Sequence, residues 1–311
     1  MSFIFNSHWI GRFGNRMHQY AYGMTYAKKH NIPFVLASRW EGVKLFKDHN
    51  NLFLSSEMQM ELYDVREEKT YSDSRNEIVK KFVPDVKFID PKNKSENYAP
   101  AECPVCFDDV CAYNKTIFEG MSKQYLLDIF QFSDEVKETE AYKYWESKAG
   151  TYDIAHLRRD DISNPDYNKQ NEQGYSVISK QSYYDAIMQF GFNPNNIEWT
   201  SDDHLKEWHK DRKETELFGW NYPVGSEYRN GLMYDWLEDF LRLYFARTIF
   251  RANSSFSWWA SFLSPTAKVY SPVLDKQVIY GRDSLEEIDV EFVEGNHPHW
   301  MYNVDDIIIP D

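Results

Sequence analysis

Residues 152–161, Tyr152-Asp-Ile-Ala-His-Leu-Arg-Arg-Asp-Asp161, decide the fold because a strand runs directly into a cluster of charges. The apolar run that ends at Leu157 predicts a buried strand. In α/β proteins, ligands bind beyond the carboxyl ends of such strands. A guanidinium group donates paired hydrogen bonds to phosphate and does not lose its charge. The stretch therefore predicts an anion site at a strand end, with Arg158 and Arg159 as its donors.

A solvated ion-pair cluster on the surface is the alternative for the same residues. His156 belongs to the apolar run itself. Side chains alternate between the two faces of a strand, so a group that can carry charge points into the structure next to the arginines. That position favours a functional site over a surface cluster.

The order of expected elements predicts an α/β fold with two domains, residues 1–150 and 151–311. In the first, a strand at 3–6, a glycine-containing loop, a helix to about His30 and a strand at 32–37 form a βαβ unit. The basic last turn of that helix and Asn31 at its exit are typical of a helix stop. Ser133 is expected to cap an acidic helix that reaches Lys148, and Gly150 marks a hinge.

The second domain is expected to alternate strands and helices from Thr151 onward. Beyond the strand that ends at Leu157, the pattern predicts further strands at 197–201, 248–252 and 268–271. It predicts helices at 181–190, 204–213, 232–245 and 254–262. Three strand ends then face a ligand, at Arg158, Asp202 and Asn253.

Two of these strand ends carry further polar side chains. Asp202 and Asp203 follow the strand at 197–201, where they either accept hydrogen bonds from a nucleoside or cap the next helix. Ala252-Asn-Ser-Ser-Phe-Ser-Trp-Trp259 closes a strand and opens a helix. Its hydroxyls and the free N–H groups of the helix start can hold a phosphate. Taken alone, this segment is better explained as a capping sequence over a packing helix.

The first domain offers a second candidate loop, Gly11-Arg-Phe-Gly-Asn15, between its first strand and first helix. Glycines there allow close approach of a ligand, and the helix start favours an anion. An ordinary turn in which Asn15 caps the helix is the alternative. His18 lies one helical turn further on, where it is either a base facing a cleft or a packed residue.

Composition excludes several classes of protein. The 311 residues carry a net charge of −14, and a nucleic-acid binder needs a broad basic face. Neither a signal peptide nor a run of membrane-spanning length is evident. The three cysteines, Cys103, Cys106 and Cys111, are odd in number and clustered, which suits a reducing compartment better than a disulfide framework. They have only partial zinc-knuckle spacing, so we expect reduced thiols, no metal and a cytoplasmic location.

Four segments in this order resemble the α-1,2-fucosyltransferases and the wider α-1,2/α-1,6/protein O-fucosyltransferase superfamily. They are Gly11-Arg-Phe-Gly-Asn15, His156-Leu-Arg-Arg-Asp-Asp161, Thr200-Ser-Asp-Asp203 and Asn253-Ser-Ser-Phe-Ser-Trp-Trp259. The resemblance covers roughly residues 4–272, although no motif anchors residues 38–150. The His-x-Arg-Arg and Asn-Ser-Ser-Phe-Ser-Trp-Trp signals are specific in combination.

The resemblance implies a GT-B-like fold, in which two Rossmann-like domains face a cleft. It implies an inverting glycosyltransferase that moves L-fucose from GDP-fucose to a hydroxyl of an oligosaccharide or glycoconjugate acceptor, in α-1,2 linkage, without a metal or other cofactor. The first domain would hold the acceptor and the second the GDP-sugar. No nucleic acid or integral membrane segment is implied.

The resemblance also implies roles for single residues. Arg158 would contact the diphosphate, Arg159 would support it, and His156 and Asp161 would shape the pocket. Asp202 or Asp203 would lie near the nucleoside, and Arg12 and Asn15 would reach the donor from the first domain. The base that deprotonates the acceptor would be His18, Asp160 or Asp161. The remaining donor contacts implied for the segment after residue 252 are Asn253, Ser254, Ser255 and Phe256.

The chain departs from the α-1,2 pattern at two places. It has Asn15-Arg-Met-His18 where that group usually has Asn-Gln-Met-Phe, and Arg158-Arg-Asp-Asp161 where Arg-Arg-Gly-Asp is common. Two alternatives therefore stay open. One is a transferase of the same fold that uses a different GDP-sugar, and the other is a non-catalytic nucleotide- or glycan-binding protein.

Overall fold

The structure is a computed structural model that describes residues 2–47, 49–65, 71–91, 102–107, 123–159, 177–201, 236–273 and 288–297. The chain forms two compact units, one ending at Ser133 and the other beginning at Asp134. Each unit is an α/β structure built around a five-stranded sheet. This confirms the predicted α/β class with two Rossmann-like units, whereas the expected cleft between them stays a prediction.

The sheet of the first unit is parallel throughout. Strand β1 lies at its centre, with β2 and β3 on one side and β5 and β4 on the other, which is the doubly wound pattern. In spatial order the strands are β3 (Leu52–Phe53), β2 (Phe34–Leu36), β1 (Ile4–Asn6), β5 (Val105–Phe107) and β4 (Lys87–Ile89). The helices of this unit are α1 (Phe13–His30), α2 (Gly42–Leu45), α3 (Ser56–Asp64), α4 (Tyr71–Phe82) and α7 (Lys123–Ile129).

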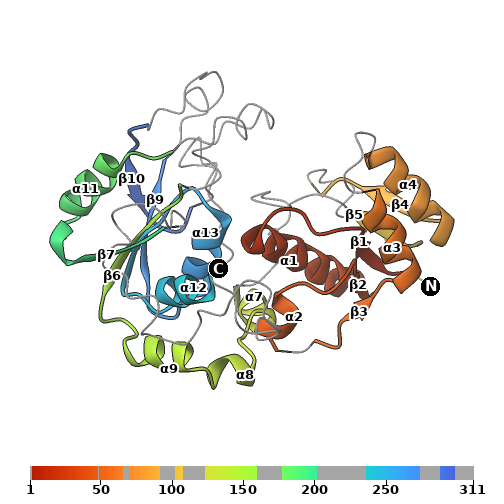
Figure 1. The fold of residues 1–311 in the computed structure, drawn as a ribbon, viewed down its shortest axis with the longest axis horizontal. Coiled ribbons are helices and arrows are strands. Elements are labelled where there is room, and N and C mark those ends of the chain that lie inside the picture. Colours follow the sequence, from red (N-terminus) through yellow and green to blue (C-terminus); the bar gives the residue numbers. More distant parts are fainter. Residues whose placement is uncertain are drawn as a thin grey trace. The chain divides into compact units, whose positions relative to one another are not determined.

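Successive side chains of β1 and β5 point to opposite faces of this sheet. Phe5 and Cys106 belong to an apolar cluster with Met58 and Leu62 of α3. On the other face, Phe107 packs edge-on against Tyr22 of α1 at 4.8 Å between ring centroids. The sheet is thus enclosed by α1 on one side and by α3 and α4 on the other (Figure 1).

The sheet of the second unit is parallel except at one edge. Strand β6 pairs in parallel with β7 and β8, β8 pairs in parallel with β9, and β10 adds antiparallel to β9. In spatial order the strands are β10 (Phe292–Glu294), β9 (Lys268–Pro272), β8 (Thr248–Phe250), β6 (Asp153–Leu157) and β7 (Ile197–Ser201). The other elements are α8 (Asp134–Lys137), α9 (Glu140–Ser147), α11 (Lys180–Gln189), the 3₁₀ helix η2 (Pro194–Asn196), α12 (Leu237–Tyr244) and α13 (Ser255–Leu263).

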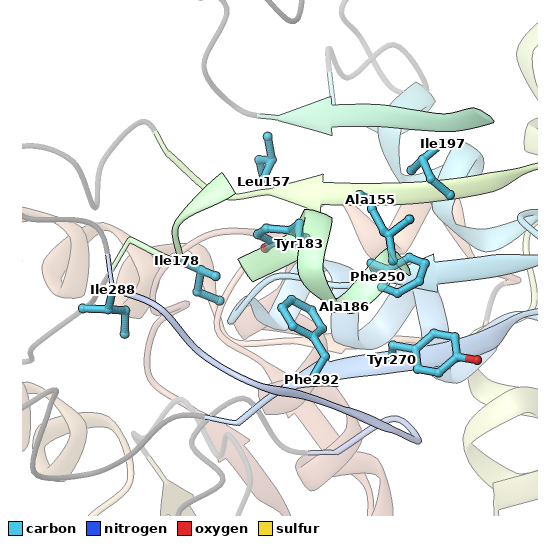
Figure 2. Close-up of a cluster of buried hydrophobic side chains, with 11 residues drawn as sticks. Ala155, Leu157, Ile178, Tyr183, Ala186, Ile197, Phe250, Tyr270, Ile288 and Phe292 are labelled. Carbon is cyan, nitrogen blue, oxygen red and sulfur yellow. The ribbon is translucent and has the colours of Figure 1, made fainter. Parts of the chain in front are cut away.

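Helix α11 covers one face of this second sheet, and α12 and α13 cover the other (Figure 1). The α11 face forms an apolar core shown in Figure 2, in which Ala155 and Leu157 of β6 meet Tyr183 of α11. Phe250 stacks on Tyr270 at 4.9 Å between centroids. Because neighbouring side chains of a strand point to opposite faces, His156 faces α12 and α13.

The sequence placed the boundary between the domains at Gly150, but the structure places it after Ser133. Helix α9 belongs to the second unit because Tyr142 packs edge-on against Phe245 at 5.1 Å. The Gly150 N–H donates to the Phe245 carbonyl at 2.9 Å, so this residue is fixed inside the second unit. The single acidic helix expected at 133–148 is two helices, and Thr139 caps the second by accepting from the Tyr142 N–H.

The strands expected at 152–157, 197–201, 248–252 and 268–271 are present, although β8 ends at Phe250, two residues earlier than expected. Helix α1 ends as predicted, with Asn31 in the left-handed conformation at φ 51°. The helix expected at 204–213 lies outside the described residues, as does the start of the one expected at 232–245. Within the described ranges, no helix combines the length and the apolar character needed to span a membrane.

Helix α3 offers a matched test of this packing, because Met58 is 2% exposed and Met60 is 68% exposed. We expect Met58→Ala to lower the free energy of unfolding by about 2–5 kcal/mol, since it leaves a cavity in the core. Met60→Ala should change it by less than about 0.5 kcal/mol. Urea denaturation of both variants measures the difference, and equal effects would contradict the packing described for this face.

Candidate functional site

The candidate site lies at the carboxyl edge of the second sheet, where the chain path reverses. From β6 the chain continues to β7 on one side, whereas β8 and β9 lie on the other. The gap between β6 and β8 is therefore the topological switch point of a doubly wound sheet. Ligands of such sheets bind outside the carboxyl ends of the strands at this point.

The pairing register brings the polar segments to that edge. Leu157 of β6 pairs with Ser201 of β7, and Ala155 pairs with Phe250 of β8. Arg158 lies three residues after Ala155, and Asn253 lies three residues after Phe250. The double arginine and the Asn-Ser-Ser segment thus leave the sheet together, as the sequence predicted.

The two arginines differ in their surroundings. Arg158 is partly exposed, whereas Arg159 is 1% exposed. The Arg159 Nη1 donates to the Arg158 carbonyl at 3.2 Å, so the second arginine braces the main chain of the first. The expected roles, in which Arg158 meets the ligand and Arg159 supports it, stay a prediction.

Tyr183 of α11 holds the end of β6 from the opposite face. Its hydroxyl donates to the His156 carbonyl at 2.9 Å within the core. Burial raises the pKa of the Tyr183 hydroxyl, while the positive charges of Arg159 and Arg251 act in the opposite direction. Two buried guanidinium groups therefore lie near this hydroxyl and favour its ionised form.

His156 contributes an aromatic face at the same edge. Its ring lies 5.9 Å from that of Phe256, the second residue of α13. Phe256 also meets Phe240 at 5.3 Å and Trp236 at 6.0 Å, both edge-on. The aromatic group around Phe256 thus borders the strand end that carries Arg158.

The segment after β8 is arranged as a helix start. The Ser254 hydroxyl accepts from the Phe256 N–H at 3.3 Å and so acts as the N-cap of α13. Ser257 donates to the carbonyls of Ala252 and Ser254. Asn253 is 2% exposed and Ser255 is 9% exposed. The structure thus shows the capping role of this segment, whereas phosphate binding at the same helix start stays a prediction.

Helix α12, which carries Phe240, is tied to β7 by a partly buried polar network. The Thr200 hydroxyl donates to Asp239 at 2.5 Å, and Arg242 donates to Glu198 at 3.0 Å. Arg242 also lies 3.7 Å from Asp239. These contacts fix the helix whose first residues stand at the candidate edge.

The glycine loop of the first unit lies at the carboxyl end of β1. Gly11 has φ +66°, and a Cβ atom there would come within 2.3 Å of the Asn15 side chain. Arg12 is exposed and occupies the N-cap position of α1, so the expected cap, Asn15, lies within the first turn instead. Arg16 donates to the Gly11 carbonyl at 3.0 Å and pairs with Glu41 at 2.6 Å.

His18 is buried in α1 with 1% of its surface exposed. Burial lowers the pKa of its imidazole to about 3, which keeps the ring neutral at physiological pH. This is the packed position that the sequence offered as the alternative to a solvent-facing base. Arg12, Asn15 and His18 belong to the first unit, and the other described candidates belong to the second.

Several candidates lie outside the described residues, namely Asp160, Asp161, Asp202 and Asp203. Cys111 lies outside them as well. Cys106 is fully buried in the apolar cluster of the first sheet, and both Cys103 and Cys106 are free thiols. Among the described residues, no group of three or more histidine, cysteine or acidic side chains is arranged to hold a metal ion.

Sequence reasoning missed three residues that shape the site: Tyr183, Asp239 and Arg251. Tyr183 lies within α11, where an aromatic residue carries no distinctive local signal, and Asp239 lies in the first turn of α12, where the helix dipole already explains an acidic residue. Arg251 follows β8 directly, and a charged residue at a strand end is normally solvated. Here it is fully buried. Only the long-range contacts of these residues identify them.

Comparison with known proteins finds no matching protein-family model and no matching curated protein sequence. Among solved structures, the α-1,6-fucosyltransferase NodZ from Bradyrhizobium, soaked with GDP-fucose, matches 94% of this chain and 99% of its own at 14% identity, with a TM-score of 0.49. POFUT1 in complex with GDP-fucose matches 86% and 97% at 12% identity, with a TM-score of 0.44. A GDP complex of an Arabidopsis thaliana FUT1 variant matches 94% and 73% at 10% identity, with a TM-score of 0.46.

The buried His18 makes stability depend on pH in a definite direction. Its folded pKa lies below that of the unfolded chain, so the unfolded state takes up the proton first and stability falls as the pH drops below about 6.5. Between pH 7.5 and pH 5 this residue alone should cost roughly 2 kcal/mol. His18→Gln should remove that share of the pH dependence in urea denaturation. Equal slopes for the variant and the parent would show that His18 is solvated.

Proposed function

We propose that the protein is a glycosyltransferase that binds a nucleoside diphosphate sugar at the carboxyl edge of its second sheet. One observation carries this proposal. The Arg158-Arg159 pair and the capped start of α13 leave the sheet on either side of its switch point. Such an edge combines fixed positive charge with backbone N–H donors, which is the chemistry that a diphosphate requires.

Fixed donors suit a reaction in which a diphosphate departs. When the bond between the sugar C1 and the β-phosphate oxygen breaks, its electron pair stays on the phosphate. The negative charge that develops there is stabilised by a guanidinium group already held in place. Arg159, which donates to the Arg158 carbonyl, supplies that rigidity.

The acceptor hydroxyl attacks C1 from the face opposite the leaving diphosphate, which inverts the configuration. Its oxygen forms the new bond, and its proton passes to a base or to the departing phosphate. Burial lowers the pKa of His18 to about 3, so its imidazole is a weak proton acceptor and is not favoured as the base. The acidic side chains after Arg159, Asp160 and Asp161, remain the proposed candidates.

The finer assignment rests on the sequence resemblance. We infer GDP-fucose as the donor, an oligosaccharide or glycoconjugate as the acceptor and an α-1,2 linkage as the product, with no metal ion required. In this assignment, His156, Asn253, Ser254, Ser255 and Phe256 line the donor. Asp202 and Asp203 complete the nucleoside contacts. The first unit contributes Arg12 and Asn15 and receives the acceptor.

Arg158→Ala tests the central assignment. We expect the Kd for GDP to rise roughly 10- to 100-fold, because about 1.5–3 kcal/mol of charge-assisted hydrogen bonding is lost. Sugar transfer should fall at least as far, while the unfolding midpoint stays near that of the parent. Isothermal titration calorimetry and a product assay measure the two effects.

Arg247→Ala is the matched control for this variant. It removes the same charge from the same unit, but at the amino end of β8, where Arg247 pairs with Asp153 at 2.6 Å. Its GDP affinity should equal that of the parent. If Arg158→Ala behaved like Arg247→Ala in both assays, the proposed diphosphate contact would be wrong.

A donor screen separates the alternative functions. A ligand that binds only the folded state raises the unfolding midpoint, so GDP should raise it more than UDP or CMP does. Transfer from GDP-fucose, but not from other GDP-sugars, supports the finer assignment. Transfer from another GDP-hexose favours a sister activity on the same fold. Nucleotide binding without any turnover or donor hydrolysis favours a binding protein.

A further inference from the structure

We propose that Arg251 is a positioning residue that couples the loop 252–254 to the segment 295–297, which follows β10. The inference rests on the proposed function, since that loop carries the proposed donor contacts. Arg251 follows the last residue of β8 and is fully buried. It touches no proposed substrate atom and acts through the main chain of its neighbours.

All three nitrogen atoms of the Arg251 guanidinium donate to protein oxygens. Nε donates to the Ser271 hydroxyl at 2.7 Å, and Nη1 donates to the Ala252 carbonyl at 3.0 Å. Nη2 donates to the His297 carbonyl. The planar fork thus joins three separate segments: the start of the loop, the end of β9 and the chain beyond β10.

Ser271 extends this connection. Its hydroxyl donates to the Gly295 carbonyl at 2.6 Å, and it accepts from the His297 N–H at 3.1 Å. The His297 ring closes the turn, because its Nε2 donates to the Glu294 carbonyl at 2.8 Å. Residues 294–297 are therefore folded onto β9 and held there by the same groups that meet Arg251.

The contact with Ala252 is the one that reaches the proposed site. Its carbonyl accepts from Arg251 and, at 3.4 Å, from Ser257 of α13. The next residues along the chain are Asn253 and the N-cap Ser254. A shift of this carbonyl would change the direction in which Asn253, Ser254 and the first N–H groups of α13 point. Sites that act through fixed donors are sensitive to such shifts.

Lysine cannot replace this arginine without a change in geometry. An ammonium group is a compact charge, whereas the guanidinium fork presents donors in fixed directions. Arg251→Lys therefore keeps the charge and most of the apolar stem but cannot keep all three contacts at once. Arg247→Lys is the matched control, because Arg247 immediately precedes β8, just as Arg251 immediately follows it, and the Arg247 side chain is 55% exposed.

The experiment uses the full chain and two readouts. Amide hydrogen exchange across 252–257 reports the order of the loop without any ligand, and titration with GDP reports the proposed site. We expect Arg251→Lys to speed exchange in that segment and to raise the Kd for GDP about tenfold or more. Arg247→Lys should leave both readouts unchanged, even where it lowers the unfolding midpoint.

The two readouts separate the possible failures. Unchanged exchange and unchanged GDP affinity in Arg251→Lys would overturn the positioning role, as would a lowered midpoint without either change. If the parent protein does not bind GDP at all, the proposed function fails, and the exchange readout still decides the coupling. Should Arg251→Lys not fold, Ser271→Ala removes the Nε acceptor together with the contacts of that hydroxyl to Gly295 and His297, and faster exchange at 252–257 is again the supporting result.

Discussion

The parallel pairing of β6 with both β7 and β8 is the constraint on which the candidate site depends. It forces three successive strand ends to one edge, so residues separated by about a hundred positions along the chain become neighbours. Burial of β6 on both faces fixes its register, since a slip by one residue would exchange His156 with the apolar side chains of the α11 face. The packing that forms the core therefore also places Arg158 at the edge of the sheet.

Much of the second unit could be predicted because its signals are local. Each parallel strand is a short apolar run that ends in polar residues, and Ser254 caps α13 through an acceptor only two residues from its donor. The anion site proposed at Arg158 and Arg159 rests on the same adjacency. The predictions for the first unit also came from local signals, namely the βαβ unit and the end of α1 at Asn31.

The remaining features depend on contacts between distant residues. The domain boundary lies at Ser133 because α9 packs against Phe245, about a hundred residues further on, and no local pattern records that contact. Arg251 is a strand-end charge like Arg158, yet it is buried because Ser271 and the His297 carbonyl meet it. His18 shares the helical spacing of a solvent-facing residue, and only the surrounding core shows that its ring is enclosed.

The fold of residues 294–297 onto β9 also limits how the chain can be shortened. Antiparallel β10 is the edge strand of the described sheet and pairs there with β9. Here, a truncation before His297 would strip an acceptor from a guanidinium in the interior and uncover the Ser271 hydroxyl. Among the described residues, the limit to trimming is therefore set by a buried charge and not by the end of β10.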